Sequence, residues 1–203
     1  APRTDDREAY TLRAVLLDKN GAVIHYCDEP MEFFREEEIA EPTALIYDAS
    51  EIQTEMSTIL EEAEKGKTVI INGLRPGEYQ FSDTIKIKVK SCGMRPLHFV
   101  SRKTGHPLVE GYTPYDFRLW YNKEADMITP IIRFTFTAEG AKPILTSGNS
   151  LRGSAWGQPL YPALACAEIP CGKGKIIVNE VDLGSHLKNP IARSFYNRLV
   201  QYK

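Results

Sequence analysis

Apolar and polar residues alternate along several short stretches of the chain, and this pattern predicts β-strands. Residues 12–18 and 22–26 are apolar runs separated by Asn20 and Gly21, which both tolerate a positive φ. This pattern predicts an N-terminal β-hairpin. Residues 84–90 alternate between aliphatic or threonine side chains and lysines, as expected for a strand with one face in water.

Two apolar runs without alternation, residues 43–47 and 68–71, flank a segment with helical periodicity. In residues 50–65 the apolar side chains fall on one helical face, and Ser50 and Gln53 have the spacing of a capping box. Gly66 ends the predicted helix. A strand, a helix and a second strand at this spacing predict a right-handed βαβ unit with parallel strands.

The C-terminal half contains further predicted strands and a second amphipathic helix. The strand candidates are residues 131–137, 143–146, 164–169 and 175–181. Asn189 is suited to cap a helix and Pro190 to its first position, and the apolar stripe continues through Phe195 and Leu199. We therefore predict one α/β domain over residues 1–203, in which residues 1–40 form the hairpin and a lead-in segment.

Composition limits the classes of function. Of the 203 residues, 42% are hydrophobic, and 25 Lys and Arg against 27 Asp and Glu give a net charge of −2. Because phosphate binding depends on clustered positive charge, no nucleic-acid partner is expected. No apolar run approaches the roughly 20 residues that span a bilayer, so no membrane partner is expected either. Residues 1–8 are polar and lack a signal-peptide pattern, which favours a piece of a longer polypeptide.

Cysteine, histidine and motif spacing predict no catalytic residue, metal or cofactor. Gly66-Lys67-Thr68 resembles the end of a P-loop but leads from a helix into a strand. Ser154 is not central between its glycines as in a nucleophile elbow, and Cys92 lacks a glycine two positions earlier. The histidines (His25, His98, His106 and His186) show no ligand spacing. The cysteines (Cys27, Cys92, Cys166 and Cys171) are expected to be inert thiols, and their pairing stays open.

Aromatic side chains are concentrated in residues 112–122, and Trp156 lies in a later polar segment. Exposed aromatic rings stack on sugars or anchor protein interfaces. The candidates for such a sugar-binding or interface role are Tyr115, Trp120, Tyr121 and Trp156. The alternative is that Phe117, Leu119 and Trp120 belong to the core, and their exposure distinguishes the two hypotheses.

Several segments resemble a C-terminal domain of large bacterial glycoside hydrolase family 2 enzymes, which are β-galactosidase-like. The resemblance rests on residues 106–111, 116–121, 143–149 and 172–178 and on Asn189-Pro190, and it covers most of residues 40–203. Such domains are similar to the class I glutamine amidotransferase-like fold. The resemblance therefore implies a flavodoxin-like three-layer α/β sandwich with a mostly parallel central sheet.

The resemblance also implies a parent β-glycosidase of carbohydrate metabolism that cleaves O-glycosyl bonds and is periplasmic or secreted. In the amidotransferase fold a cysteine nucleophile follows a central strand, but the turn after residues 68–71 begins with Asn72 and Gly73. The leading hypothesis is therefore a non-catalytic accessory domain that packs on neighbouring domains or mediates oligomer contacts. A carbohydrate-binding module is the alternative, followed by a free-standing hydrolase or amidotransferase-like enzyme that uses Cys92 or Ser154.

Overall fold

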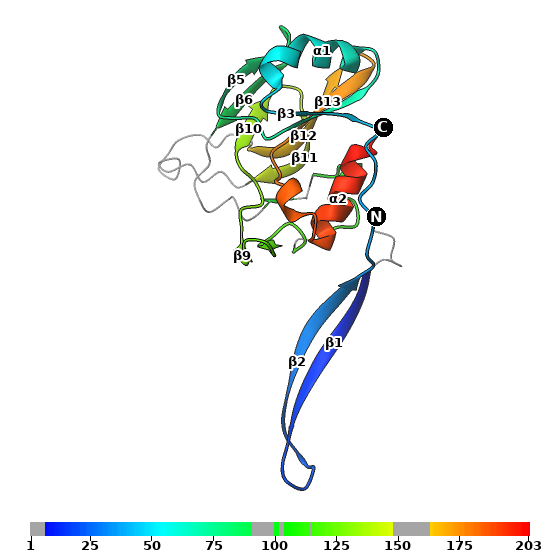
Figure 1. Cartoon of the computed structure of the whole chain (residues 1–203), viewed down its shortest axis with the longest axis vertical. Coiled ribbons are helices and arrows are strands. Elements are labelled where there is room, and N and C mark those ends of the chain that lie inside the picture. The colour runs from blue at the N-terminus through cyan, green and yellow to red at the C-terminus, as the bar shows by residue number, and fades with distance from the viewer. Residues whose placement is uncertain (1–6, 91–99, 102–103, 114, 148–162) are drawn as a thin grey trace.

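Strands dominate the computed structural model, which describes residues 7–90, 100–101, 104–113, 115–147 and 163–203 (Figure 1). The strands are β1 (Arg7–Leu17), β2 (Val23–Phe34), β3 (Leu45–Asp48), β4 (Thr68–Asn72), β5 (Gly77–Gln80), β6 (Lys86–Lys90), β7 (Val100–Ser101), β8 (Tyr121–Asn122), β9 (Met127–Ile128), β10 (Thr135–Ala138), β11 (Lys142–Ser147), β12 (Leu164–Cys171) and β13 (Gly174–Asn179). The helices are α1 (Ile52–Glu64) and α2 (Pro190–Val200), with short 3-10 turns η3 (Pro107–Val109) and η4 (Gly184–His186).

The central sheet is mixed, with the strand order β3-β4-β13-β12-β10-β6-β5; β11 pairs with β12, and β7 pairs with β11. The strands β3, β4 and β13 are parallel, whereas the other pairs of this sheet are antiparallel. Strands make up 43% and helices 18% of the described residues. The prediction of a flavodoxin-like three-layer α/β sandwich with a mostly parallel sheet is therefore wrong.

The connections between strands explain this difference. Parallel neighbours need a crossover of a dozen or more residues, usually a helix. Such a crossover joins β3 to β4 through α1, but a tight turn at Gly172, with a φ of 57°, joins β12 to β13 and reverses the chain. Short strands occupy much of the described chain between α1 and α2, so the sheet is extended mainly by antiparallel pairing.

Several local predictions are confirmed. The βαβ unit forms with β3 and β4 parallel, and β13 joins the same sheet. Asn189 caps α2 by accepting hydrogen bonds from the amides of Ile191 and Ala192. The predicted capping box of α1 is wrong, because the N-cap is Glu51 and its side chain accepts a hydrogen bond from the Asp48 amide instead.

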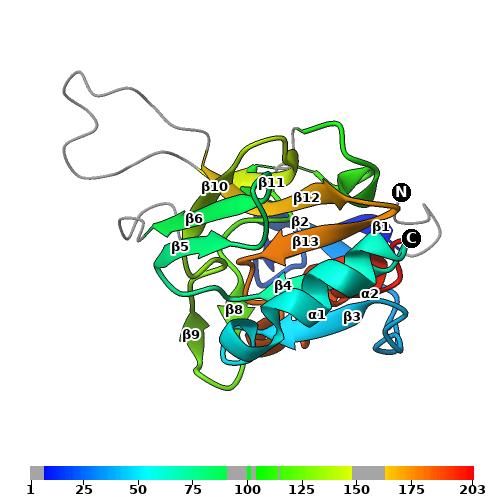
Figure 2. The same ribbon diagram turned by 90° about the horizontal axis from the view of Figure 1, so that it is seen from above.

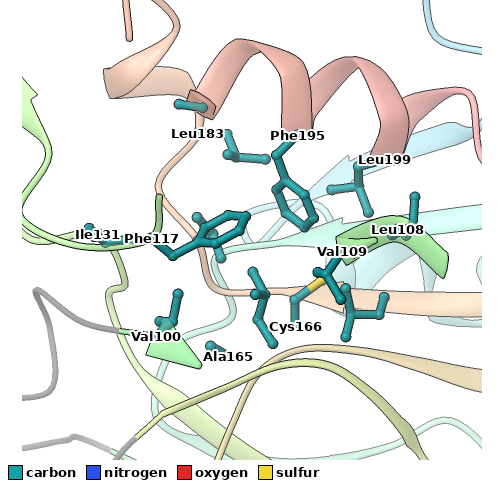
Figure 3. Close-up of a cluster of buried hydrophobic side chains, with 14 of the residues drawn as sticks. Val100, Leu108, Val109, Phe117, Ile131, Ala165, Cys166, Leu183, Phe195 and Leu199 are labelled. Carbon is teal, nitrogen blue, oxygen red and sulfur yellow. The ribbon is translucent and has the colours of Figure 1, made fainter. Parts of the chain in front are cut away.

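Two apolar layers lie on the two faces of the sheet. In β4, Val69 and Ile71 belong to the layer that contains the buried residues of α1, whereas Ile70 belongs to the layer with those of α2. Figure 2 shows α1 in front of β3, β4 and β13. In the other layer, Phe195 points from α2 toward Phe117, beside residues of the sheet such as Cys166 (Figure 3). The parallel strands are thus covered on both faces, which explains their continuous apolar runs.

The hairpin of β1 and β2 projects away from the rest of the structure (Figure 1). Residues 8–17 and 23–33 are all exposed. At its base, Arg7 forms an ion pair with the buried Asp116, with 3.0 Å between Nη1 and Oδ2, and Phe34 packs against the core. The predicted hairpin therefore forms, with longer strands than the sequence pattern indicated.

Candidate functional site

A pocket of about 440 Å3 lies at the carboxyl ends of the parallel strands β3, β4 and β13. Ligands of open α/β sheets bind at this end of the strands, where the connections leave toward opposite faces. Here α1 follows β3 on one face, and α2 follows β13 on the other. Each strand ends in a polar residue that lines the pocket: Asp48 in β3, Asn72 in β4 and Asn179 in β13. Ser50 and Glu180, shortly after β3 and β13, also line it.

Glu180 is a buried carboxyl group that lines this pocket without a well-formed hydrogen bond. Its exposed fraction is 1%, and neither Oε1 nor Oε2 makes a hydrogen bond of good geometry with any residue that the structure describes, although the Leu74 amide lies near the carboxyl group. Burial raises the pKa of Glu180 to about 8, because the opposing effects of the Leu74 amide and of the Arg133 charge are smaller. At neutral pH the side chain is therefore mostly a neutral carboxylic acid, which both donates and accepts hydrogen bonds.

The backbone fixes this carboxyl group at the edge of the sheet. The Glu180 amide donates to the Ala165 carbonyl at 2.8 Å, and the Glu180 carbonyl accepts from the Arg133 amide at 3.1 Å. Beside it, Asn179 Nδ2 donates to Asn72 Oδ1 and to the Val181 carbonyl. This network holds the two strand ends together and leaves Asn72 Nδ2 without a partner among the described residues.

Charged side chains of both signs surround the pocket. Arg133 and Asp182 form an ion pair with 2.9 Å between Nη2 and Oδ1. Arg75 and Asp48 also line the pocket, and neither side chain forms an ion pair with any residue that the structure describes. The site therefore offers a guanidinium group and a carboxylate with unused hydrogen-bonding capacity.

The remaining wall of the pocket is apolar. It is formed by Ile46 and Ile70 from the sheet and by Tyr196, Leu199 and Val200 from α2. Buried polar groups on one side and apolar groups on the other are typical of small-molecule sites, whose volumes run from about 300 to 1,000 Å3.

A second buried carboxylate, Glu168, provides a contrast. Its Oε1 accepts a hydrogen bond from Lys142 at 3.0 Å, while Lys175 and His106 lie 3.5 and 3.6 Å from Oε2. Burial acts to raise the pKa of Glu168, but the two lysines and the Tyr202 hydroxyl together outweigh it and the pKa is lowered. The Glu168 charge is compensated by two lysines, whereas the Glu180 carboxyl group forms no ion pair with any described residue.

The aromatic candidates from the sequence do not line this pocket where the structure describes them. Trp120 is 2% exposed, and its Nε1 donates to the Asp116 carbonyl at 2.6 Å, so it belongs to the core and presents no stacking surface. Tyr115 is 72% exposed beneath the Arg118 guanidinium, and the Tyr121 hydroxyl donates to Asp126. Trp156 lies outside the described residues.

The structure leaves the predicted alternatives for a nucleophile untested. Cys92 and Ser154 lie outside the described residues. Cys166 is fully buried, and burial raises the pKa of its thiol. The described residues contain no group of three or more His, Cys, Asp or Glu side chains suited to a metal ion. In the same part of the chain, neither helix has the length and apolar character that crossing a bilayer requires.

Sequence inspection missed the pocket because its residues form no motif. The sequence marked Asn72 only because the amidotransferase fold has its cysteine nucleophile in this turn. Glu180 lies inside a predicted apolar strand, where no site was expected. The sequence carried one weak signal of the pocket. The apolar runs that form the parallel strands β3, β4 and β13 each end in a polar residue.

Comparison with known proteins adds little to this description. No protein-family model matches the chain, and no curated protein matches it. Among solved structures, the chain is similar to the cytoplasmic protein STM3548 from Salmonella typhimurium, with 11% sequence identity, 95% of each chain covered and a TM-score of 0.43. The candidate site therefore depends on its own geometry.

Proposed function

We propose that this chain is a non-catalytic binding domain for a small polyhydroxylated ligand of the carbohydrate class. The ligand occupies the pocket at the ends of β3, β4 and β13. The observation that carries this proposal is the Glu180 carboxyl group, which is 1% exposed, makes no well-formed hydrogen bond to any described residue and is part of the pocket lining.

An unsatisfied buried polar group costs a folded protein about 1–3 kcal/mol. A buried polar group without good hydrogen bonds, at the carboxyl ends of parallel strands, is typical of a binding site in which the ligand supplies the missing hydrogen bonds. A ligand hydroxyl group is a suitable partner, because it accepts a hydrogen bond from the neutral Glu180 acid and donates one to its carbonyl oxygen.

The other lining residues fit a neutral ligand that carries several hydroxyl groups. Asp48 accepts hydrogen bonds, Arg75 donates them, and Asn72 Nδ2 supplies a further donor. The apolar wall with Tyr196 and Leu199 suits the C–H face of a sugar ring. A multiply charged anion fits less well, because Asp48 and Asp182 line the same space.

A carbohydrate ligand also agrees with the expected carbohydrate partner of a glycosidase accessory domain. The parent β-glycosidase, its substrate and its neighbouring domains stay predictions that rest on the sequence resemblance.

Titration calorimetry with glucose, galactose, xylose, lactose and cellobiose tests the proposal, with inorganic phosphate as the anionic comparison. We expect at least one sugar to bind at pH 6 and to bind at least tenfold more weakly at pH 9, where Glu180 is ionised. Glu180→Gln should retain binding and lose this pH dependence, and Glu180→Ala should weaken binding at least tenfold.

The matched control is Glu139→Ala, which truncates an exposed glutamate outside the pocket. Absence of binding to every sugar, or equal binding by the wild type and Glu180→Ala, would contradict the proposal. Turnover of an aryl glycoside that Glu180→Gln abolishes would make Glu180 a general acid and the chain an enzyme.

A further inference from the structure

The projecting hairpin has two faces of different character. Residues directly opposite in an antiparallel pair point to the same face, and successive residues point to opposite faces. The register places Tyr10 opposite Met31 and Leu12 opposite Glu29. One face, called the apolar face below, therefore consists of Glu8, Tyr10, Leu12, Ala14, Leu16, His25, Cys27, Glu29, Met31 and Phe33.

The opposite face carries compensated charges. Arg13 forms a bidentate pair with Asp28, with distances of 2.6 and 2.7 Å, and its guanidinium lies over the Tyr26 ring. Arg7 similarly binds Glu32. This face also exposes Val15 and Tyr26, but its arginines are paired with carboxylates.

No residue that the structure describes covers the apolar face. Tyr10, Leu12, Leu16 and Phe33 are each between 53% and 59% exposed. The Tyr10 and Phe33 rings meet edge to face, and with Leu12 and Met31 they line an open groove. An isolated two-stranded hairpin is at best marginally stable in water, so a stable ribbon of this length requires a surface against its apolar face.

We propose that the apolar face is one half of a β-sandwich. Its partner is the open apolar face of an antiparallel β-sheet in a neighbouring domain of the same polypeptide, with a basic side chain opposite Glu29. This inference is independent of the ligand proposed for the pocket.

The available area favours a linked domain over a free partner. A strand of 11 residues at about 3.4 Å per residue is about 37 Å long, and a two-stranded ribbon is about 10 Å wide. Two such faces in contact remove roughly 800 Å2 from water. This area lies within the range of about 600–1,500 Å2 for contacts between domains of one chain, but below the roughly 1,200–2,000 Å2 of stable free complexes.

Charge favours a different sheet over a second copy of this hairpin. Leu12 and Glu29 form the middle pair of the apolar face. When two copies of the hairpin pack face to face in opposite directions, Glu29 of one copy therefore lies against Glu29 of the other. Two carboxylates then share a dry layer, which is costly without a cationic partner. A sheet that presents lysine or arginine at this position avoids the repulsion and pairs with Glu29.

The base of the hairpin ties the ribbon to the core of the chain. Arg7 is tied to Asp116, and Phe34 packs against the core. The neighbouring domain therefore contacts the part of the hairpin beyond Arg7 and Phe34.

Hydrogen exchange measured by mass spectrometry tests this inference on two proteins: the complete natural polypeptide and the 203-residue chain. We expect amides of residues 8–17 and 23–33 to exchange at least tenfold more slowly in the complete polypeptide. Leu12→Asp should remove this protection, whereas Thr11→Asp, one residue away on the opposite face, should preserve it.

Two results would overturn the proposal. One is equally fast exchange of the hairpin in both proteins, or equal effects of Leu12→Asp and Thr11→Asp. The other is protection in the 203-residue chain itself together with a dimeric mass by light scattering, which would make a second copy the partner.

Discussion

Asn179 Nδ2 donates a hydrogen bond to Asn72 Oδ1 at 3.0 Å, and the two residues are register partners at the ends of the parallel strands β13 and β4. Asn179 is 1% exposed, and its Oδ1 also accepts from the Val181 amide at 3.2 Å. One side chain thus stabilises both the strand ends and the turn that places Glu180 in the pocket.

Replacing Asn179 with alanine should therefore destabilise the protein and the site together. The change leaves the Val181 amide and Asn72 Oδ1 without this partner, and unsatisfied buried groups cost about 1–3 kcal/mol. Urea unfolding of Asn179→Ala should show a lower midpoint with an unchanged slope. A midpoint equal to that of the wild type would show that water replaces the side chain at no cost.

Glu180 should make stability depend on pH in a defined direction. Because its pKa is raised from 4.5 to about 8, the folded protein keeps this proton at pH values where the unfolded chain has lost it. The associated stability is fully present below about pH 4.5 and is lost as pH rises through about 8. At about 1.4 kcal/mol per unit, the loss amounts to about 3–5 kcal/mol.

Glu180→Gln removes this titration while keeping the shape of the side chain. The free energy of unfolding of the variant minus that of the wild type should therefore rise between pH 5 and pH 9, as measured by urea unfolding at each pH. The difference between the two proteins isolates Glu180 from other titrating groups. A difference that stays constant over this range would mean that Glu180 has an ordinary pKa.

Gly174 should not tolerate a side chain, because α1 and the segment after it approach β13 there. A Cβ atom at Gly174 would lie 2.5 Å from the Ala63 carbonyl oxygen and closer still to that of Lys67. Both are backbone atoms, so Gly174→Ala should destabilise the protein by about 3 kcal/mol or more. Gly184→Ala is the control, since nothing lies within 4 Å of its Cβ position. Thermal unfolding compares them, and equal midpoints would refute the predicted clash.

Local signals in the sequence predicted the elements that local chemistry determines. The Asn20-Gly21 turn, the βαβ unit and the Asn189 cap of α2 are all present. In each of them, a few adjacent residues set the backbone geometry. The direction of the remaining strands depended instead on whether a helix or a tight turn connects them, and one Gly172 turn reverses β13 relative to β12.

The site was harder to predict, because burial decides its chemistry. In the sequence, Glu180 and Glu168 are both acidic residues inside predicted strands. Three-dimensional packing gives Glu168 two lysines, whereas burial of Glu180 outweighs the Leu74 amide and the Arg133 charge, so their pKa values move in opposite directions. Burial also decides the role of Trp120. The aromatic composition of residues 112–122 suggested a surface that stacks on sugars, but Trp120 lies in the core.

The anchor of the hairpin should depend on Asp116 far more than on the ion pair in the exposed part of the ribbon. Asp116 is 6% exposed, and its Oδ2 accepts from Arg7 at 3.0 Å and from the Thr113 amide. Removing one member of such a buried pair leaves Arg7 with less compensation, so Asp116→Asn should cost about 1–3 kcal/mol in urea unfolding.

Asp28→Asn makes the same chemical change in the exposed pair with Arg13, whose side chains are 36% and 58% exposed. Because exposed ion pairs are screened by water, this variant should leave the urea midpoint unchanged. Asp116→Asn should also increase hydrogen exchange at residues 7 and 34, which pair at the base of the hairpin. Equal midpoints for the two variants would mean that the hairpin is held by Phe34 packing and not by the Arg7–Asp116 pair.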